Sequence, residues 1–203
     1  MSEMSTPGTR ERLIAAMTDA LRRRGLHGVG LTELLQQAGA PKGVLYHHFP
    51  GGKTELAIAA IDAVVDRMLR GLDALLAATP DPLDALRRWL AGATARLQDS
   101  GFESGCPLAT VALESTAQDA TLREALARAF TRVRERIAQA LELAGEPRAQ
   151  AQGLAALIVA AYEGGLLQAR VAQSSEPIQQ ATTSLLALLS ARPPGAVAHP
   201  QGV

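Results

Sequence analysis

The sequence is poor in the residue types on which several classes of protein depend. Its 203 residues include one cysteine, Cys106, so no disulfide can form within the chain. Aromatic residues make up only 3 % of the chain, and no alternation of apolar and polar residues stands out, so a β-sheet would have little to build on. Ala and Leu dominate instead, in a chain that is 47 % hydrophobic, which favours a folded helical protein.

Net charge and long apolar runs are absent as well. The formal charge is zero, although residues 1–60 hold seven Lys/Arg and five Asp/Glu, so the N-terminal part is slightly basic. The longest apolar run, LAALIVAAY at 154–162, is too short to span a bilayer. The first residues, MSEMSTPGTRER, lack the apolar core of a signal peptide. We therefore expect a cytoplasmic protein that does not enter a membrane.

The spacing of apolar residues predicts an all-α protein, because they recur every three or four positions through most of the chain. The expected helices cover residues 9–24, 31–39, 42–48, 53–78, 82–100, 107–116, 119–144, 147–173 and 177–191. We divide them into an N-terminal three-helix domain, 9–52, and a C-terminal helical domain, 53–191, whose first helix connects the two. Residues 1–8 and 192–203 are expected to be disordered.

The polar chemistry concentrates in PKGVLYHHFPGGKTEL, residues 41–56. This stretch holds two of the six aromatic residues, two of the four histidines and both lysines. It follows a turn at Gly39, where a positive φ would let one short helix end and the next begin steeply, which predicts a helix-turn-helix. Leu45 and Phe49 are four residues apart and would face the core, so the outer face of this helix is free to enter a DNA major groove.

Six residues are candidates for DNA contact. A lysine near the start of the reading helix would reach base acceptors or a phosphate, and a glycine beside it would let the backbone approach. A tyrosine and a histidine would donate hydrogen bonds to phosphates, and a threonine and a lysine would sit at helix N-termini, which favour anions. The candidates are Thr32, Lys42, Gly43, Tyr46, His47 and Lys53. We expect His48 to pack or lie at the surface, and His27 to lie in a turn.

The run GLHGVGLTELLQQAGAPKGVLYHHFPGGKTELA, within residues 9–59, resembles the DNA-binding domain of TetR-type transcriptional regulators. The PGGK insertion and the later ESGCPLATVALE resemble the branch of regulators of drug-resistance and flavonoid-response genes. The resemblance implies a homodimeric repressor that binds double-stranded operator DNA through the six candidates. It also implies that a small molecule binds the C-terminal domain and tilts the helix at 53–78. Pro41 stands where the family often has a Ser or Thr cap, so contacts from that hydroxyl are missing.

An effector pocket is expected inside the C-terminal domain. No cluster of Lys or Arg faces inward by periodicity, so the sequence favours a neutral or weakly cationic lipophile, bound mainly by burial. The candidate lining residues are Met68, Trp89, Phe102, Cys106, Glu114, Phe130, Tyr162 and Glu163. The two carboxylates have a structural alternative as partners within the protein. For Cys106 a small buried role is preferred over a reactive thiol.

The last two expected helices are apolar on more than one face, which predicts a dimer seam on them. The candidate seam residues are Ile158, Leu166, Leu185 and Leu189. We expect no metal site, because no Cys pair or carboxylate set has ligand spacing, and no cofactor or enzyme site. Two other functions stay open. One is a DNA-binding regulator without a ligand, controlled by a protein partner or by its abundance, and the other is a helical binding or scavenging protein whose DNA-binding domain is unused.

Overall fold

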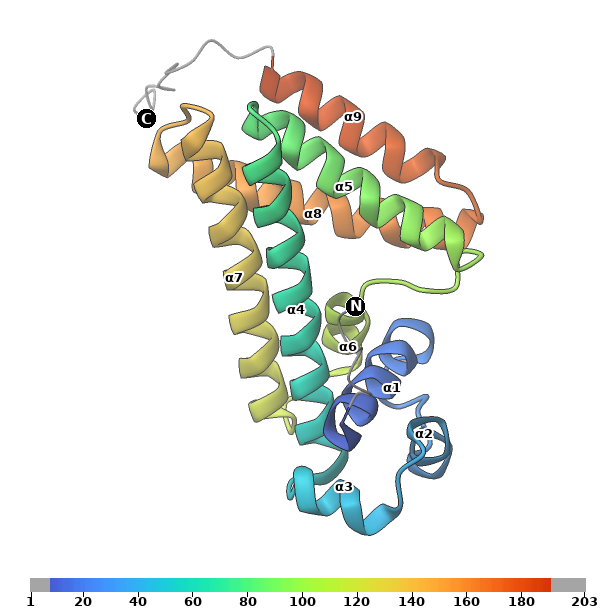
Figure 1. Cartoon of the computed structure of the whole chain (residues 1–203). Helices are drawn as coiled ribbons and strands as arrows, with labels where there is room; N and C mark the ends of the chain where they lie inside the picture. The colour runs from blue at the N-terminus through green and yellow to red at the C-terminus, as the bar shows by residue number, and fades with distance from the viewer. Residues whose placement is uncertain (1–7, 191–203) are drawn as a thin grey trace, which may run out of the picture. The chain divides into compact units, whose positions relative to one another are not determined.

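Every regular element that the structure describes is an α-helix. The computed structural model describes residues 8–190, and within that range nine helices and no strand occur (Figure 1). The all-α prediction is confirmed for this part of the chain. The predicted disorder at the two ends falls outside the described residues, except for Gly8, whose backbone N–H donates to the Glu11 carboxylate at 3.0 Å.

The chain forms two compact units, and two long helices belong to both. The first unit holds the residues up to 68 and residues 103–131, and the second holds residues 69–102 and those from 132 onward. The helices α4 (Gly52–Ala78) and α7 (Ala120–Leu143) begin in the first unit and end in the second. This division differs from the predicted boundary at residue 52, because α6 (Pro107–Glu114) belongs with the N-terminal helices.

In the first unit, α1 (Thr9–Arg24) is the support for the other short helices. It contacts α2 (Leu31–Ala38), α3 (Lys42–His48) and α6. The side chains that fill this core are fully buried: Leu13, Met17, Leu21, Leu34, Leu45, Phe49 and Leu56. Helices of seven and eight residues are too short to be stable alone, so this packing is what holds α2 and α3 in place.

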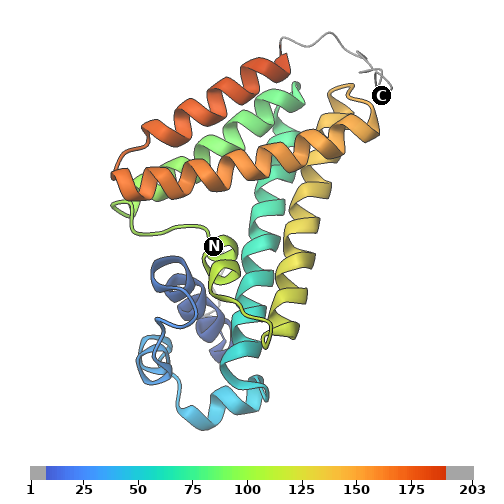
Figure 2. The same cartoon turned by 180° about the vertical axis from the view of Figure 1, so that it is seen from behind.

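In the second unit, three helices lie side by side. The helix α9 (Glu176–Ser190) contacts both α5 (Pro82–Asp99) and α8 (Arg148–Ala172), as Figures 1 and 2 show from opposite sides. A Cβ atom on Gly165 of α8 would lie 3.0 Å from the Cα of Ile178 on α9. Gly165 therefore permits a closer approach of these two helices than any other residue would.

The helices begin and end within two residues of the predicted positions. Asp81 caps α5 by accepting the backbone N–H of Leu83 at 2.9 Å, and a proline occupies the first turn. The largest difference is at α6, which ends two residues earlier than predicted. The Asp119 carboxylate then accepts both the backbone N–H and the hydroxyl of Thr116 at 2.8 Å, and these two hydrogen bonds, in that order, lower the pKa of Asp119.

Candidate nucleic-acid interface

The turn between α2 and α3 has the backbone that its sequence predicts. Gly39 adopts the left-handed conformation, with φ 57° and ψ 41°, at the C-terminus of α2. Its backbone N–H donates to the Gln36 carbonyl at 3.1 Å, and the N–H of Ala40 donates to the Leu35 carbonyl at 3.0 Å. Pro41 precedes the first residue of α3 and offers no side-chain cap. Backbone hydrogen bonds therefore close the turn without a side-chain cap on α3.

The helix α3 has a buried side and an open side. Leu45 and Phe49 are 0 % and 1 % exposed, which confirms the predicted inward face. The guanidinium of Arg10, on α1, lies over the Phe49 ring, 5.3 Å from its centre. His48 is half-buried, and its ring meets that of Phe49 edge-on at 6.5 Å, which agrees with the packing role expected for it.

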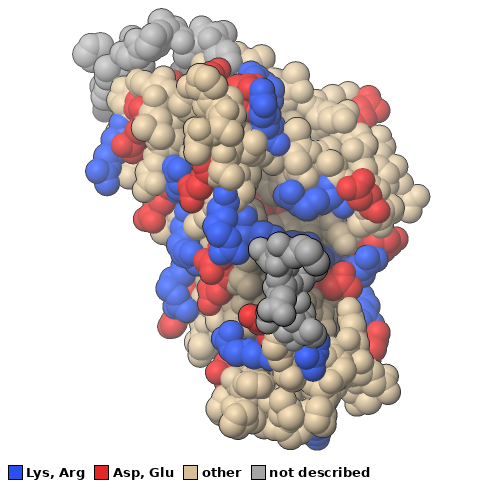
Figure 3. Space-filling view, viewed as in Figure 1, with Lys and Arg blue, Asp and Glu red and all other residues tan. Residues whose placement is uncertain are grey.

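Five of the six residues predicted to contact DNA are exposed, one on α2 and four on α3. Thr32, Lys42, Gly43, Tyr46 and His47 are all exposed. The helix α3 contains no Asp or Glu, and Figure 3 shows no acidic side chain over it on the face in view. A surface with hydrogen-bond donors and without carboxylates suits the phosphate backbone of DNA.

Tyr46 reaches the start of α4, where Lys53 stands. Gly52 has a φ of +68°, and a Cβ at this position would lie 3.4 Å from the Tyr46 ring, so the ring rests against this glycine. Lys53, the next residue, is half-buried. Burial lowers the pKa of Lys53, and the negative charge of Glu114 opposes that shift. Tyr46 thus lies beside Gly52, the residue that precedes Lys53, and the DNA contacts of both side chains stay a prediction.

Arg12 is a residue of this region that sequence reasoning missed. Its Nε donates to the Ala38 carbonyl at 3.0 Å, and its Nη2 donates to the Thr9 hydroxyl at 3.2 Å. The cation therefore stands at the C-terminus of α2, where the helix dipole favours positive charge. No sequence signal marks the contact, because its partner is a carbonyl 26 positions away.

An ion pair joins the C-terminal end of α1 to the start of α2. The Arg24 guanidinium donates to both oxygens of the Glu33 carboxylate, at 2.8 and 2.7 Å. This hydrogen bonding lowers the pKa of Glu33 and raises that of Arg24. Both side chains are exposed, so the pair contributes little to stability. It does neutralise the one carboxylate beside Thr32, which would otherwise repel a phosphate.

The residues predicted for the effector pocket fall into both units. Trp89, Phe102, Tyr162 and Glu163 belong to the second unit, and the rings of Trp89 and Tyr162 are buried with their centres 6.5 Å apart. Met68, Cys106, Glu114 and Phe130 belong to the first unit. Cys106 is buried, and Glu114 accepts backbone N–H groups from the connection between α1 and α2.

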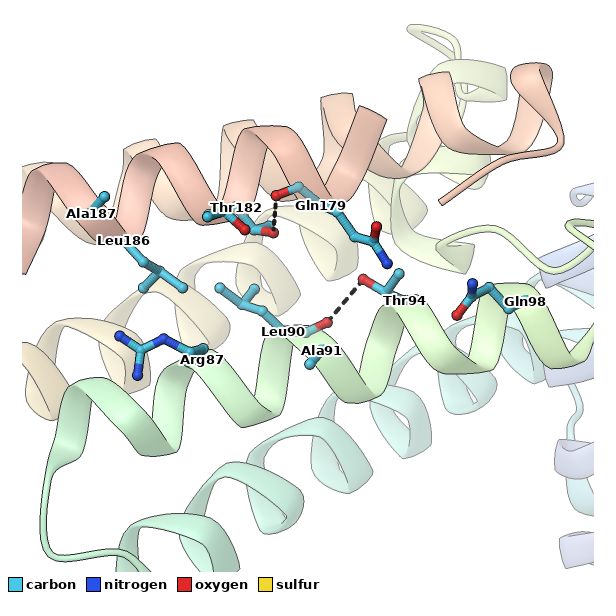
Figure 4. A pocket seen from close by; sticks show the side chains of 10 residues that line it. Arg87, Leu90, Ala91, Thr94, Gln98, Gln179, Thr182, Leu186 and Ala187 are labelled. Carbon is cyan, nitrogen blue, oxygen red and sulfur yellow. Dashed lines mark hydrogen bonds between the residues drawn. The ribbon is translucent and has the colours of Figure 1, made fainter. Parts of the chain in front are cut away.

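A groove between α5 and α9 contains none of these eight residues. Its volume is about 370 Å³, and its lining residues are Arg87, Leu90, Ala91, Thr94, Gln98, Gln179, Thr182, Thr183, Leu186 and Ala187 (Figure 4). The hydroxyls of Thr94 and Thr182 donate to carbonyls of their own helices, at Leu90 and Ile178. Apolar and polar side chains thus line the groove together. The predicted effector residues stay a prediction.

The four predicted seam residues require a correction. Ile158, Leu166, Leu185 and Leu189 are between 1 % and 7 % exposed, so they are interior residues of a single chain. The large apolar side chains that these two helices expose are their neighbours: Leu157, Leu167, Val171 and Leu188. An Ala-rich helix that is apolar on two faces does not reveal by periodicity which face is inside.

Similarity to known proteins bears on what this surface does. A sequence model described as "Transcriptional regulator LmrA/YxaF-like, C-terminal domain" matches residues 82–184, and another, "Bacterial regulatory proteins, tetR family", matches residues 13–60. The chain belongs to the TetR family. The first match also confirms the predicted branch of the family.

Individual TetR-family proteins resemble the chain over nearly its full length. An uncharacterized HTH-type transcriptional regulator of Mycobacterium tuberculosis is 33 % identical, over 92 % of this chain and 97 % of that protein. The HTH-type transcriptional repressor NemR of Escherichia coli is 29 % identical, over 89 % and 94 %. A crystal structure of the regulatory protein TetR from Rhodobacter sphaeroides has a TM-score of 0.79 at 29 % identity, over 88 % and 97 %. Each of these proteins is named as a regulator and none as an enzyme.

By length and composition alone, α8 of this TetR-family chain could also cross a membrane. That is a weak indication, because the core helix of a soluble protein meets the same criteria. Here α8 packs on α9 and α5 and buries Ala155, Ile158 and Ala169.

Within residues 8–190, no three His, Cys, Asp or Glu side chains are grouped to hold a metal ion.

Proposed function

We propose that the protein is a homodimeric repressor of transcription that a small lipophilic molecule releases from its operator. Its family makes it a transcriptional regulator that binds DNA. The observation that carries the proposal is the outer face of α3, where four residues between Lys42 and His47 are exposed and free of acidic neighbours on the helix. Leu45 and Phe49 fix that helix from behind.

The roles on this surface follow from side-chain chemistry. Lys42, at the start of α3, reaches base acceptors in the major groove or a phosphate, and Gly43 lets the backbone come close. Tyr46 and His47 donate to phosphates, as does Thr32 at the start of α2. Phosphate contacts position the protein, and the few contacts to base edges select the sequence.

The test uses an operator that the wild-type protein selects from a random-sequence DNA pool. Tyr46→Phe keeps the ring that rests on Gly52 and removes only the hydroxyl. One hydrogen bond is worth about 1 kcal/mol, so losing one in each half of a dimer weakens binding roughly 30-fold. Fluorescence anisotropy measures the affinity. A wild-type protein that selects no sequence contradicts the proposed function, and wild-type affinity in Tyr46→Phe contradicts the role of Tyr46.

The exposed side chains of α8 and α9 support the homodimer. Leu157, Leu167 and Leu188 are each at least half exposed, which is an unusual concentration of apolar surface for two neighbouring helices. Gly164 lies among them, and a Cβ there would meet nothing within 4 Å in its own chain. A glycine inside a helix costs about 1 kcal/mol relative to alanine, and close approach by α8 of a second copy explains it. A two-fold axis would then set two α3 helices about 34–36 Å apart, one turn of DNA.

The effector is proposed to be a neutral or weakly cationic lipophile in the cytoplasm. The rings of Trp89 and Tyr162 are buried near each other in the second unit, and an aromatic effector would bind against them. Because α4 is one continuous helix that begins at the DNA-reading end, a ligand that prefers one orientation of α4 would change DNA affinity. Neutral aromatic compounds are titrated while Trp89 emission and DNA release are followed. If only charged, sugar-like or phosphorylated compounds release DNA, the proposed effector class is wrong.

A further inference from the structure

The last residue of α6 holds the chain that connects α1 to α2. The Glu114 carboxylate accepts the backbone N–H of Leu26 at 2.5 Å and lies 3.4 Å from the N–H of His27. These partners are 88 and 87 positions away, and all of them belong to the first compact unit. A carboxylate that accepts backbone N–H groups makes hydrogen bonds about twice as strong as those between neutral groups.

Gly25 leaves the space that this carboxylate occupies. Its φ of 72° and ψ of −173° lie in a region that essentially only glycine adopts. A Cβ atom at this position would overlap the Glu114 carboxylate. The backbone conformation of Gly25 and the absence of a side chain there therefore both make room for the Glu114 carboxylate.

The other end of α6 is tied to α1 as well. The backbone N–H of Gly105, just before α6, donates to the Arg22 carbonyl at 3.0 Å. The helix α6 has eight residues and is about 12 Å long. A hydrogen bond at each end, from Gly105 and to Glu114, joins it to the end of α1 and the residues that follow. Both hydrogen bonds lie at the C-terminal end of α1, where the chain turns toward the DNA-reading helices.

The connection held by Glu114 leads directly into the DNA-reading surface. Five residues after Leu26 the chain enters α2, which carries Thr32 and packs against α3. Glu114 is also close enough to Lys53 for its charge to act on that ammonium group. The same carboxylate thus touches the entry to α2 and influences the start of α4.

We propose that Glu114 is a positioning residue for DNA reading, so that operator specificity depends on α6 as well as on the helix-turn-helix. The inference rests on the proposed DNA-binding function and adds the device that orients it. Glu114 does not touch DNA. It sets the angle at which α2, and with it α3, is presented.

The sign of the change in DNA affinity distinguishes a positioning role of Glu114 from a direct effect of its charge. Glu114 is negative and close to Lys53, so removing its charge would by itself strengthen binding to a polyanion. Loss of positioning has the opposite sign, because a wrongly angled α3 forfeits base contacts. A general loss of folded protein would reduce the apparent affinity for every DNA sequence by the same factor, and would leave the specificity ratio unchanged.

The experiment compares two variants that alter the contact differently. Glu114→Gln keeps the length of the side chain and removes the charge, whereas Glu114→Asp keeps the charge and withdraws the oxygens by one methylene. Glu124→Gln removes the same charge from an exposed position of α7 in the same unit and serves as the control. Anisotropy measures affinity for the operator selected by the wild type and for a scrambled duplex of equal length.

Both Glu114 variants are expected to bind the selected operator roughly tenfold more weakly, while affinity for the scrambled duplex stays the same or rises. The Leu26 amide should also exchange its hydrogen faster than in the wild type or in Glu124→Gln. Wild-type specificity in both variants, or an equal loss on both duplexes, overturns the proposal while leaving DNA binding intact. If Glu114→Gln lacks the wild-type circular dichroism spectrum, Glu114→Asp decides. A wild-type protein that selects no operator removes the proposed function and this inference together.

Discussion

Replacing Lys53 by alanine tests how the start of α4 engages DNA. Lys53 comes directly after Gly52, against which the Tyr46 ring rests, and it is half-buried beside the charge of Glu114. Burial lowers its pKa, and the carboxylate opposes the shift by favouring the charged form. We therefore expect an ammonium group whose direction is fixed by its surroundings and which neutralises one phosphate in each half-site.

The size of the effect comes from counterion release. Each phosphate contact contributes about 0.9 to the slope of log affinity against log salt, so two contacts in a dimer contribute about 1.8. Log salt rises by roughly 0.6 between 50 and 200 mM. Raising the salt over that range weakens binding by both proteins, and the fold-loss should be about ten times smaller for Lys53→Ala than for the wild type. At the lowest salt concentration its affinity should lie furthest below that of the wild type.

Anisotropy titrations at several salt concentrations measure this slope. Arg148→Ala is the matched control, because it removes a positive charge from an exposed position at the start of α8, in the second unit. Its slope should equal that of the wild type. A Lys53→Ala slope equal to the wild-type slope, at a lower affinity, would refute the phosphate contact and leave only an indirect role for the lysine.

Three further changes have directions set by the structure. Leu167→Asp, on the exposed face of α8, should raise the dimer dissociation constant at least roughly 100-fold in sedimentation, whereas Leu143→Asp, equally apolar and exposed on α7, should not; a dimer in both variants places the seam elsewhere. Thr18 is 4 % exposed and no described residue hydrogen-bonds its hydroxyl, so Thr18→Val should raise the free energy of unfolding by about 1 kcal/mol in urea titrations, and a lower midpoint would contradict this. The pKa of Asp119 is lowered by its bonds to Thr116, so its contribution to stability is present above the unfolded-state pKa and is lost as pH falls through the folded-state pKa. Asp119→Asn should remove that part of the acid dependence in thermal melts, and an Asp119 pKa at its ordinary value by NMR would exclude the effect.

Much of the fold was predictable because local rules decide it. The helix boundaries follow from apolar spacing, proline and glycine, and Gly39 adopts the left-handed conformation that a tight turn needs. Leu45 and Phe49 were placed inward by their spacing alone, and both are buried. The same spacing put Tyr46 and His47 on the open side, where the structure has them.

Contacts between distant parts of the chain were not predictable in this way. Arg12 meets a backbone carbonyl and Glu114 meets backbone N–H groups, and backbone atoms carry no sequence signal. On α8 the error had another cause. Ile158 and Leu157 are adjacent and equally apolar, and only the packing of α8 in the folded unit decides that the first is buried and the second exposed.

The attachment of α6 to the end of α1 sets a rule for recombining regulators of this kind. A chimera joined at the end of α3 would keep Gly25 and discard Glu114, so it would inherit backbone N–H groups without their acceptor. Compatible parents would both carry glycine and glutamate at these two places. If the parents differ there, residues 103–131 would have to be transferred together with the N-terminal helices. The unit that must be transferred to keep DNA reading intact is thus discontinuous in sequence. Its second segment, residues 103–131, lies within the region that the C-terminal family model matches.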